Sequence, residues 1–311
     1  MDTFAVTILV GVRHLRCNQP CSIAVTMAHL RCLGRADAAG PLTKLEAQEA
    51  TSDCKTSVLT EADYAAASEL IGRSFAGTPQ HDPEWSLHWV VGPQLKRENV
   101  ELRSSLAEFY LSFSMSECTR SGGVVLAAKD ADGKLQAVCV CRKMRSGKVA
   151  SALWQGWLFG THALSRMATG KIPPFYMSKE YAPLRKSADK SIDRRYKCIS
   201  KAMEQLHGHQ TSPHWYVALM AVDPPAQGYG YGGQLMRAVS RMAAADGVHC
   251  YLEASGTGNK AFYEHLGYEA VDQKRLIVTE TVDVEWPAQE HFYAMVRRSL
   301  PKNISTDPQS R

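Results

Sequence analysis

The stretch from residue 214 to residue 232 constrains the fold of this chain more than any other. It reads HWYVALMAVDPPAQGYGYG. Residues 215–222 form an almost unbroken apolar run, which is long enough for one buried strand and too short for a buried helix. The Asp-Pro-Pro sequence that follows ends the strand, because proline cannot donate to a β-ladder. The sequence therefore predicts a buried strand that stops sharply before a glycine-rich loop.

Three glycines at alternate positions follow this strand and precede a predicted helix. Apolar residues recur at helical spacing after them, at positions 235, 236, 239, 242 and 243. The first amides of a helix have no intrahelical partner, and the helix dipole places partial positive charge there. Glycines let the backbone close around an anion, so the pattern predicts a phosphate site. The alternative is a tight strand-to-helix turn in which the glycines serve packing only.

Two classes of phosphate-bearing ligand suit such a loop, and the first is a dinucleotide. Gly228-x-Gly230-x-x-Gly233 fits the dinucleotide fingerprint, and Glu253 falls about where a ribose-binding acid is expected. A doubly wound domain needs further βαβ units after the loop, however. The short runs after Glu253 look antiparallel, and the strands before the loop form a hairpin. The sequence therefore disfavours a dinucleotide.

The second class is acyl-coenzyme A, whose pyrophosphate makes the same demand on a helix N-terminus. Gln227-x-x-Gly230-x-Gly232 resembles the (Gln/Arg)-x-x-Gly-x-(Gly/Ala) fingerprint of the GNAT N-acetyltransferases. Residues 259–268, NKAFYEHLGY, resemble a second block of that family, Asn…(Phe/Leu)-Tyr…Gly-(Phe/Tyr), at the family's spacing. The blocks HWYVALMAVDP, YLEAS and FYEHLGYE are most similar to the branch that includes puromycin N-acetyltransferase.

The resemblance implies an α/β (α+β) fold with a mixed, mostly antiparallel central sheet, a splayed strand pair and helices on both faces. It also implies acetyl-CoA as co-substrate and no metal. The core acetyl-CoA-binding motifs are expected at 214–268, within an N-acetyltransferase domain at 55–298. A poorly ordered extension at 1–54 and a tail at 299–311 flank that domain.

Acetyl transfer to an amine needs a neutral amine, a polarised thioester carbonyl and a proton for the leaving thiolate. By the resemblance, Glu253 binds the ammonium group of the acceptor and accepts its proton, directly or through water, and Tyr263 protonates the thiolate. Cys250 offers a ping-pong alternative, but no base accompanies it in sequence. The resemblance assigns acetyl-CoA contacts to Ala221, Val222, Gln227, Gly228, Tyr229, Gly230, Tyr231, Gly232 and Asn259.

We therefore expect a transferase that acetylates a primary amine, of a small molecule, by direct attack in a ternary complex. Two alternatives stay open: a protein or peptide N-acetyltransferase, and a non-catalytic acyl-CoA sensor. The insertion at 144–212 bears on this choice. A closed pocket lined by Trp154, Trp157 or Tyr176 would favour a small molecule, and a wide groove flanked by carboxylates would favour a peptide.

Composition adds little to these expectations. A net charge of +5 suits an anionic small ligand as well as nucleic acid, and we expect neither nucleic acid nor a membrane as a partner. No apolar run approaches the ~18–20 residues of a membrane helix. The nine cysteines include no C-x-x-C pair and indicate reduced thiols in a cytoplasmic protein. Arginines without intervening acids between residues 2 and 37 also resemble an organelle-targeting extension.

Elsewhere the pattern predicts a strand at 55–59, helices from Thr60 to Phe75 and at 94–115, and a hairpin at 124–142. Helices in the insertion are interrupted by prolines at 173, 174 and 183. A strand at 248–252, a short helix at 259–266 and closing strands at 268–271, 276–284 and 291–296 follow the loop. His207, His209 and His214 could suggest a metal, but solvated polar positions explain them more simply.

Overall fold

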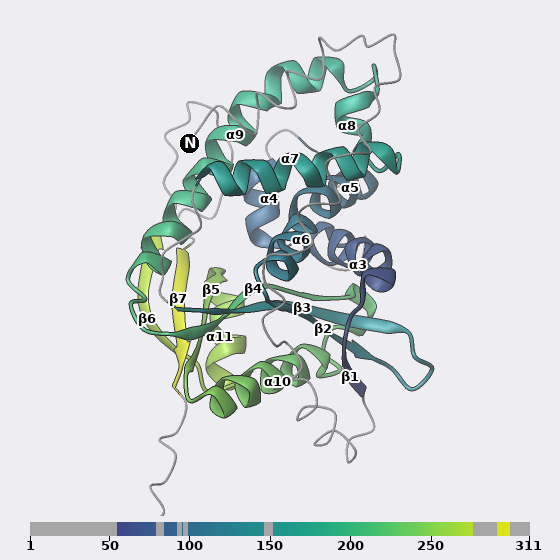
Figure 1. The fold of residues 1–311 in the computed structure, drawn as a ribbon. Helices are drawn as coiled ribbons and strands as arrows, with labels where there is room; N and C mark the ends of the chain where they lie inside the picture. The colour runs from purple at the N-terminus through teal and green to yellow at the C-terminus, as the bar shows by residue number, and fades with distance from the viewer. Residues whose placement is uncertain are drawn as a thin grey trace, which may run out of the picture.

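A mixed α/β arrangement is built around one sheet, with helices on both of its faces (Figure 1). The computed structural model describes residues 55–78, 84–91, 95, 99–145, 152–275 and 291–298. The predicted extension at 1–54, strand at 276–284 and tail at 299–311 lie outside these residues. No described helix is both long enough and apolar enough to cross a membrane.

The described strands form a sheet of seven in the order β1-β2-β3-β4-β5-β7-β6. Every neighbouring pair is antiparallel except β4 and β5, so the predicted mostly antiparallel sheet is confirmed. A parallel pair needs a crossover connection, which here contains helix α10 (Tyr231–Asp246). The bounds are β1 (Lys55–Val58), β2 (Val124–Lys129), β3 (Leu135–Met144), β4 (His214–Val222), β5 (His249–Ser255), β6 (Glu269–Arg275) and β7 (His291–Arg297).

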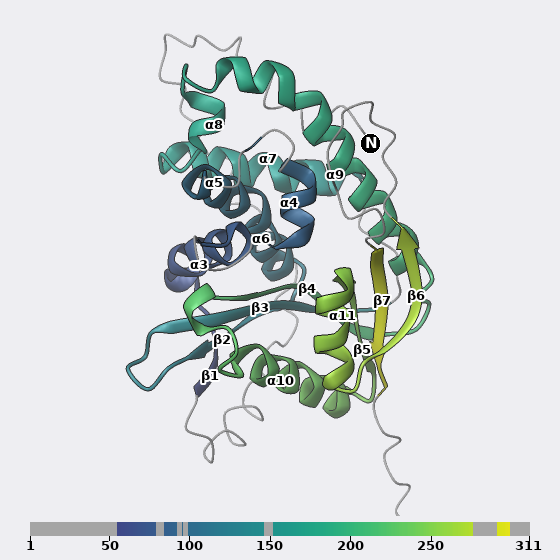
Figure 2. The same ribbon diagram turned by 180° about the vertical axis from the view of Figure 1, so that it is seen from behind.

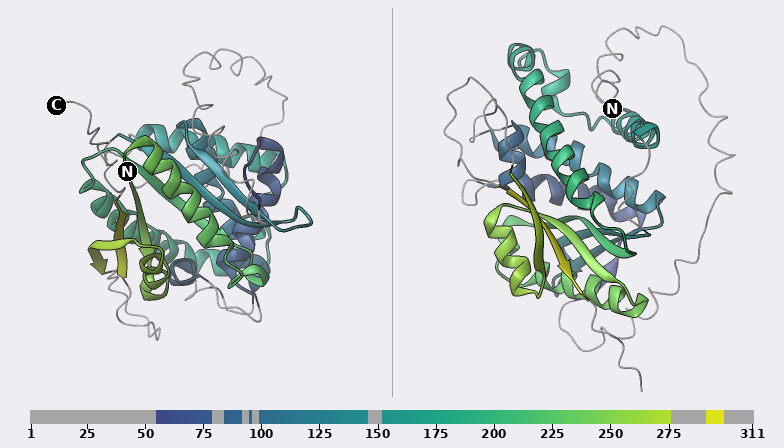
Figure 3. Two further views of the ribbon diagram at one scale, coloured as in Figure 1. Left: turned by 90° about the horizontal axis from the view of Figure 1, so that it is seen from below. Right: turned by 90° about the vertical axis from the view of Figure 1, so that its left-hand side faces the viewer.

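The two faces of the sheet carry helical layers of different size (Figures 1 and 2). α10 and α11 (Gly256–His265) cover one face, where their apolar side chains share a core with those of β3 and β5. In the larger layer, α9 extends down to β7 and the edge strand β6 (Figure 3). That layer contains α3 (Tyr64–Ala76), α4 (Trp85–Val91), α5 (Val100–Leu111), α6 (Phe113–Arg120), α7 (Ala152–Ala168), α8 (Pro174–Met177) and α9 (Ala182–Gly208).

Short-range signals set several element ends where the sequence predicts them. Asp63 Oδ2 accepts from the backbone amide of Thr60 at 3.1 Å and from its hydroxyl at 2.9 Å, which forms the predicted capping box before α3. Gly77 follows α3 with a φ of 75°, and Gly133 turns the β2–β3 hairpin with a φ of 82°. These left-handed conformations favour glycine.

The predicted helix at 94–115 is not continuous, because α5 and α6 meet at Ser112. The hydroxyl of Ser114 donates to the carbonyl of Leu111 at 2.7 Å. At the junction the amide of Met115 donates to the carbonyl of Ser112 at 3.1 Å, a 3₁₀-type bond that interrupts the α-helical ladder. The apolar spacing on which the prediction rested does not register this change.

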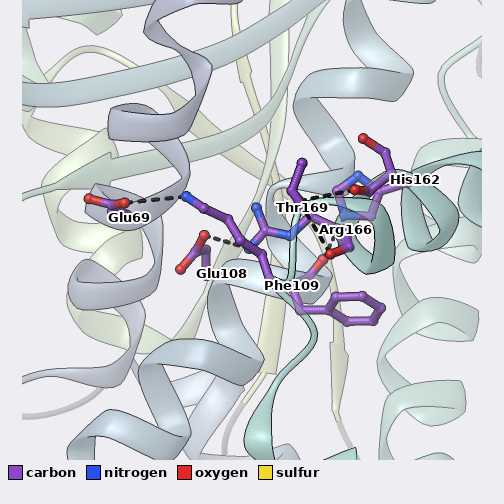
Figure 4. A network of polar contacts seen from close by, with 8 residues as sticks. Glu69, Glu108, Phe109, His162, Arg166 and Thr169 are labelled. Atoms are coloured by element: carbon purple, nitrogen blue, oxygen red, sulfur yellow. Dashed lines mark hydrogen bonds and ion pairs between the residues drawn. The ribbon is translucent and has the colours of Figure 1, made fainter.

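The insertion after β3 forms α7, α8 and α9. Pro183 does not interrupt α9 but lies in its first turn, where no amide donor is needed. Polar contacts fasten α7 to its neighbours (Figure 4): Arg166 pairs with Glu108 of α5, and His162 Nε2 lies 3.0 Å from the carbonyl oxygen of Phe109. The insertion is therefore an integral part of the larger helical layer.

Strands β4 and β5 pair over only part of their length. Their parallel register ends at the pair Val217 and Leu252. At this point β4 carries an extra residue, Ala218, which has no partner on β3 and forms a β-bulge that bends the strand. β4 continues to Val222 and β5 to Ser255 with no further pairing between them among the described residues. The predicted splayed pair is thus present, and it opens toward the glycine loop.

An ion pair holds the end of β4 against α3. Arg73 Nε and Nη2 donate to the two carboxylate oxygens of Asp223 at 3.2 and 3.1 Å. The Asp223 side chain is 6% exposed and that of Arg73 47%. Bidentate geometry fixes both partners, so this pair sets where the strand ends and the loop begins.

We predict a coupling free energy of about 1–2 kcal/mol between Arg73 and Asp223 in a double-mutant cycle. The variants are Arg73→Met, Asp223→Asn and the double variant, and urea denaturation measures the free energy of unfolding. Because Arg73 is half exposed, solvent screening keeps the coupling below that of a fully buried pair. Strictly additive effects would show that the pair does not stabilise the end of β4.

Candidate functional site

The end of β4 brings together a glycine loop, an unpaired strand edge and a buried carboxyl group. The loop consists of η3 (Pro224–Ala226) and residues 227–230, and α10 begins directly after it. Gly228 and Gly230 have φ angles of 85° and 87°. A Cβ at either position would meet no described atom within 4 Å. Both positions therefore need glycine for its backbone conformation, and the space beside them is open.

Gly232 has the other role that the sequence allowed, which is close packing. A Cβ at this position would lie 3.3 Å from Val222 Cγ2 and 3.4 Å from Phe262 Cζ. The backbone at Gly232 is thus held tightly between β4 and α11. The open backbone at Gly228 and Gly230 suits the predicted phosphate cradle, whereas Gly232, in the first turn of α10, has the packing role.

The N-terminus of α10 has the electrostatic character of an anion site. Its first intrahelical bond runs from the amide of Gln234 to the carbonyl of Gly230, so the preceding amides have no partner within the helix. The first turn contains no acidic residue. Arg237 Nη1 lies 3.3 Å from the position that a Cβ of Gly233 would occupy, which adds a positive charge beside this turn. Sequence reasoning missed Arg237 because it lies outside the glycine fingerprint.

The edge of β4 offers backbone groups on the side of the gap. The amide of Asp223 donates to the carbonyl of Gln136 on β3 at 2.8 Å. Backbone groups alternate in direction along a strand, so those of Ala221 also point toward β3. Those of Met220 and Val222 point away from β3, toward the gap. The geometry therefore favours Met220 and Val222 over Ala221 as backbone contacts for an extended ligand.

The other loop side chains that the sequence singles out differ in their surroundings. Gln227 Nε2 donates to the carbonyl of Val222 at 3.4 Å and ties the loop to the strand edge. Tyr229 is largely exposed, whereas Tyr231 packs partly against the core between β4 and α10. The structure thus places Gln227 as a brace of the loop and Tyr229 at its outer surface.

Glu253 follows the last residue of β5 that pairs with β4, so it borders the gap. Its side chain is 1% exposed, and burial raises the pKa of its carboxyl group to about 7. The hydroxyls of Tyr251 and Tyr216 and the charge of Arg142 offset part of this rise. Oε1 is buried and has no hydrogen-bond partner among the described residues. A carboxyl group with this pKa can accept or release a proton near neutral pH.

Two of the histidines predicted to be solvated are buried, and that prediction is wrong for them. His207, at the end of α9, and His214, at the start of β4, are 4% and 0% exposed, while His209 is exposed. The Nε2 atoms of His207 and His214 lie 3.0 Å apart, and His207 Nδ1 lies 3.8 Å from Glu253 Oε1. Burial lowers the pKa of both imidazoles, that of His207 to about 4. Their place beside Glu253 comes from the packing of α9 on the sheet, which no local pattern reveals.

Within the described part of the chain, no group of three or more His, Cys, Asp or Glu side chains has the arrangement of a metal site. Cys250 is buried between β5 and α10, and burial raises the pKa of its thiol to about 11. A thiol that stays protonated at neutral pH is a poor nucleophile. The ping-pong alternative therefore gains no support.

Tyr263 lies on α11, on the opposite face of the sheet from Glu253. Side chains of β5 alternate between faces: Leu252 packs with α10 and α11, and Glu253 points to the side of Tyr251 and α9. Tyr263 is buried in the core cluster that contains Leu252, and Val222 packs against this cluster. Burial raises the pKa of the Tyr263 phenol, so it keeps its proton at neutral pH. Tyr263 is thus both a core residue and a potential proton donor.

Asn259 connects to a residue that sequence reasoning did not single out, Glu84. Asn259 Nδ2 donates to Ser255 Oγ at 3.1 Å, and the Ser255 hydroxyl donates to Glu84 Oε1 at 2.5 Å. The other carboxylate oxygen of Glu84 accepts from the amide of Leu87 at 3.0 Å, in the first turn of α4. One carboxylate therefore joins α4 to the end of β5 and to α11. Glu84 belongs to no motif, and only the fold brings it to Ser255.

The aromatic residues of the insertion have different surroundings. The side chain of Trp154 lies outside the described ones, and Trp157 is 46% exposed near the guanidinium of Arg120. The hydroxyl of Tyr176 contacts that of Tyr110, within a cluster of aromatic rings from α5, α7, α8 and α9. The structure thus places Tyr176, one of the predicted pocket residues, among other aromatic side chains.

The centre of this site is similar to a known protein family. Residues 196–270 match the family described as acetyltransferase (GNAT) domain. This segment runs from α9 through the glycine loop to the start of β6, and it contains both Glu253 and Tyr263. The site therefore lies within the segment that matches this family.

Solved structures of acetyltransferases are similar to a larger part of the chain. Arylalkylamine N-acetyltransferase 2 from Aedes aegypti is 14% identical, with 79% of this chain and 99% of that chain covered and a TM-score of 0.47. A protein from Corynebacterium glutamicum described as histone acetyltransferase HPA2 and related acetyltransferase is 18% identical, over 81% and 100%, with a TM-score of 0.43. The ribosomal-protein-S18-alanine N-acetyltransferase from Escherichia coli is 14% identical, over 81% and 98%, with a TM-score of 0.39. Likeness at this level does not indicate a substrate.

We predict that Glu253→Gln stabilises the folded protein at pH 8 and changes its stability little at pH 4. The pKa of the Glu253 carboxyl is raised in the folded protein to about 7 from an ordinary 4.5, so its ionisation opposes folding. This penalty is absent below pH 4.5, grows as the pH rises through 7 and reaches at most about 3 kcal/mol above it. Urea denaturation at both pH values measures the difference.

Glu269→Gln is the matched control, because Glu269 is exposed at the start of β6. We expect this variant to change stability by less than about 0.5 kcal/mol at either pH. If Glu253→Gln were no more stable than the wild type at pH 8, burial would not be destabilising the ionised carboxylate.

Proposed function

We propose that the protein is an N-acetyltransferase that transfers the acetyl group of acetyl-CoA to a primary amine of a small molecule. The observation that carries the proposal is the divergence of β4 and β5 after Val217 and Leu252. It leaves the end of β4 without a strand partner on that side among the described residues. The glycine loop lies at the end of this edge, and Glu253 borders the same gap.

The loop and the strand edge suit the two ends of a CoA thioester. First-turn amides of α10 and the Arg237 guanidinium would bind the pyrophosphate, while Gly228 and Gly230 let the backbone approach it. Backbone groups of Met220 and Val222 would bind amides of the pantetheine arm, as a sheet edge binds an added strand. When bound, acetyl-CoA supplies the acyl group as a thioester. Further contacts from the sequence-based proposal are Ala221, Gln227, Tyr229, Tyr231, Gly232 and Asn259.

Proton transfers at the two faces of the sheet complete the proposed reaction. A free alkyl amine has a pKa near ~10 and arrives protonated, so it must lose a proton before it attacks. The Glu253 carboxylate would bind the ammonium group and accept that proton, directly or through water. The amine nitrogen then bonds to the carbonyl carbon while the carbon–sulfur bond breaks. Tyr263, on the opposite face, would donate its phenolic proton to the departing thiolate, and the second proton that the nitrogen loses as the amide forms would restore the phenol.

The larger helical layer would receive the acceptor, because it covers the face to which Glu253 points. Aromatic side chains of the insertion, with Tyr110 and Tyr176 in hydroxyl contact, supply apolar surface with polar tips. Such a lining suits the amine of a small organic molecule. The proposal also keeps the sequence-based likeness to the branch that includes puromycin N-acetyltransferase. Acetylation of peptides and of a protein N-terminus are outcomes of the test below.

Titration calorimetry and thiol release test this function. We expect acetyl-CoA to bind and NADH not to bind, because the sheet is not doubly wound. Release of free thiol from acetyl-CoA should then depend on an added amine, in a panel of arylalkylamines, polyamines, amino-sugar antibiotics and N-terminal peptides. Binding without turnover of any amine would identify a non-catalytic acyl-CoA sensor. Turnover of peptides alone would identify a protein or peptide N-acetyltransferase.

Gly232→Val tests the placement of the cofactor within the same assays. A branched side chain would displace Val222 and Phe262, so we expect at least about tenfold weaker acetyl-CoA binding. Gly208→Ala is the control, because a Cβ there meets no described atom within 4 Å. Unchanged affinity in Gly232→Val would place the cofactor elsewhere.

We predict that Tyr263→Phe lowers kcat about 10- to 100-fold for an accepted amine near pH 7, because the thiolate loses its proton donor. Its KM for acetyl-CoA should change little, since the phenyl ring keeps the core packing. Tyr268→Phe is the matched control: Tyr268 is buried in the same core cluster and packs edge-on against Tyr263. Equal kcat values for the two variants would remove Tyr263 as the general acid.

A further inference from the structure

A row of histidines leads from Glu253 to the protein surface. His207 Nδ1 lies 3.8 Å from Glu253 Oε1, and His207 Nε2 lies 3.0 Å from His214 Nε2. The ring of His214 stacks on that of His249, with centroids 5.4 Å apart and an interplanar angle of 28°. His214 Nδ1 lies 2.8 Å from the carbonyl oxygen of Ser212, in the exposed turn before β4. The row thus spans α9, β4 and β5 and ends at solvent.

Hydrogen bonding determines which nitrogen of each imidazole carries the proton. The carbonyl of Ser212 can only accept, so His214 must be protonated at Nδ1 and its Nε2 is an acceptor in the neutral ring. His207 must then donate from Nε2, which leaves a lone pair on its Nδ1. That lone pair faces Glu253 Oε1, a buried oxygen without a hydrogen-bond partner among the described residues. An ionised Oε1 faces another lone pair there, which is unfavourable. A protonated Oε1 faces an acceptor for its proton.

We propose that His207 is a positioning residue that acts through Glu253, taking over the proton that Glu253 removes from the acceptor amine and passing it through His214 toward solvent. The inference rests on the proposed acetyl transfer and adds a route by which the proton leaves the site. One proton leaves the amine nitrogen for Glu253 Oε1 and continues to His207 Nδ1. The Nε2 proton of His207 moves to His214 Nε2, and the Nδ1 proton of His214 leaves to water beside Ser212. Glu253 returns to its ionised form, and both imidazoles regain their starting tautomers by proton exchange with water before the next turnover.

The surroundings of His207 and His214 are consistent with a path for a single proton. The ring of His207 packs on those of Tyr216 and Tyr251, with centroid distances of 4.4 and 5.0 Å. A fixed cation that acts on His207 is Arg142 of β3, whose guanidinium lies over the ring of Tyr216. Arg142 is itself paired with Glu117 of α6 at 2.7 Å, so the two charges largely cancel.

Other ionisable groups lie farther out. His249 of β5 is partly buried beside His214, with Nε2 3.4 Å from Gln210 Oε1. Asp272 of β6 pairs with the exposed His209 at 3.1 Å. Burial lowers the pKa of His207, His214 and His249, so each stays neutral at pH 7 and holds an incoming proton only briefly. A neutral row passes a proton on instead of storing it.

His207→Gln separates the relay from a structural role. The amide nitrogen of glutamine can replace Nε2 as the donor to His214, which preserves the link between α9 and β4, but it provides no basic Nδ1. We expect kcat near pH 7 to fall at least about tenfold, with the KM for acetyl-CoA unchanged. The pH dependence of kcat should shift to higher pH, and added imidazole should restore part of the rate. His209→Gln, on the exposed neighbour, is the matched control and should behave as the wild type.

A His207→Gln variant with the kcat and pH profile of the wild type would overturn the relay. Nitrogen-15 NMR of the imidazoles gives a second test that does not depend on turnover. We expect the Nε2–H tautomer for His207 and the Nδ1–H tautomer for His214, and the opposite tautomers would overturn the proposal. If the wild type released no thiol with any amine, the proposed function would fail instead, while the tautomers would still test the hydrogen-bond order of the row.

Discussion

The structure depends on the point at which β4 and β5 stop pairing. A parallel pair that continued to the strand ends would satisfy the backbone groups of both, and no extended ligand could enter between them. The extra residue at Ala218 bends β4 just after Val217, and the two strands diverge from there. Backbone groups near the core are nearly always paired, so an edge that no further described strand pairs is suited to a partner from outside the chain. Because the glycine loop lies at the end of the same strand, that partner would also meet the helix N-terminus.

The divergence also connects two chemical environments, one on each face, that a closed sheet would keep apart. Glu253 points toward the larger helical layer, and Tyr263 lies in the core on the side of α10. Burial acts on both groups in the same direction: it raises the pKa of the carboxyl into the neutral range and keeps the phenol protonated. A buried carboxyl group beside two buried histidines is costly for stability. Such an arrangement is typical of functional sites, where groups that lower the stability of the fold serve proton transfer.

Much of the fold follows from local signals. The capping box at Thr60, the hairpin turn at Gly133 and the apolar strand before the glycines depend on contacts within a few residues, and each element forms where the sequence places it. The helix predicted at 94–115 divides at Ser112, where a 3₁₀-type bond interrupts the α-helical ladder within an otherwise regular apolar pattern. The interruption predicted at Pro183 is absent, because proline breaks the interior of a helix but suits its first turn.

The sequence by itself determined the glycine loop and the helix that begins after it, because the two are contiguous in the chain. Their geometry follows from backbone conformation, as the φ angles of Gly228 and Gly230 show. It also indicated Glu253 and Tyr263, through the resemblance to a family. Only the tertiary structure decided their environment: how deeply Glu253 is buried, on which face it lies, and that His207 and His214 lie against it. Burial and contacts between distant elements set the pKa of a side chain, and these arise only when α9 packs on the sheet.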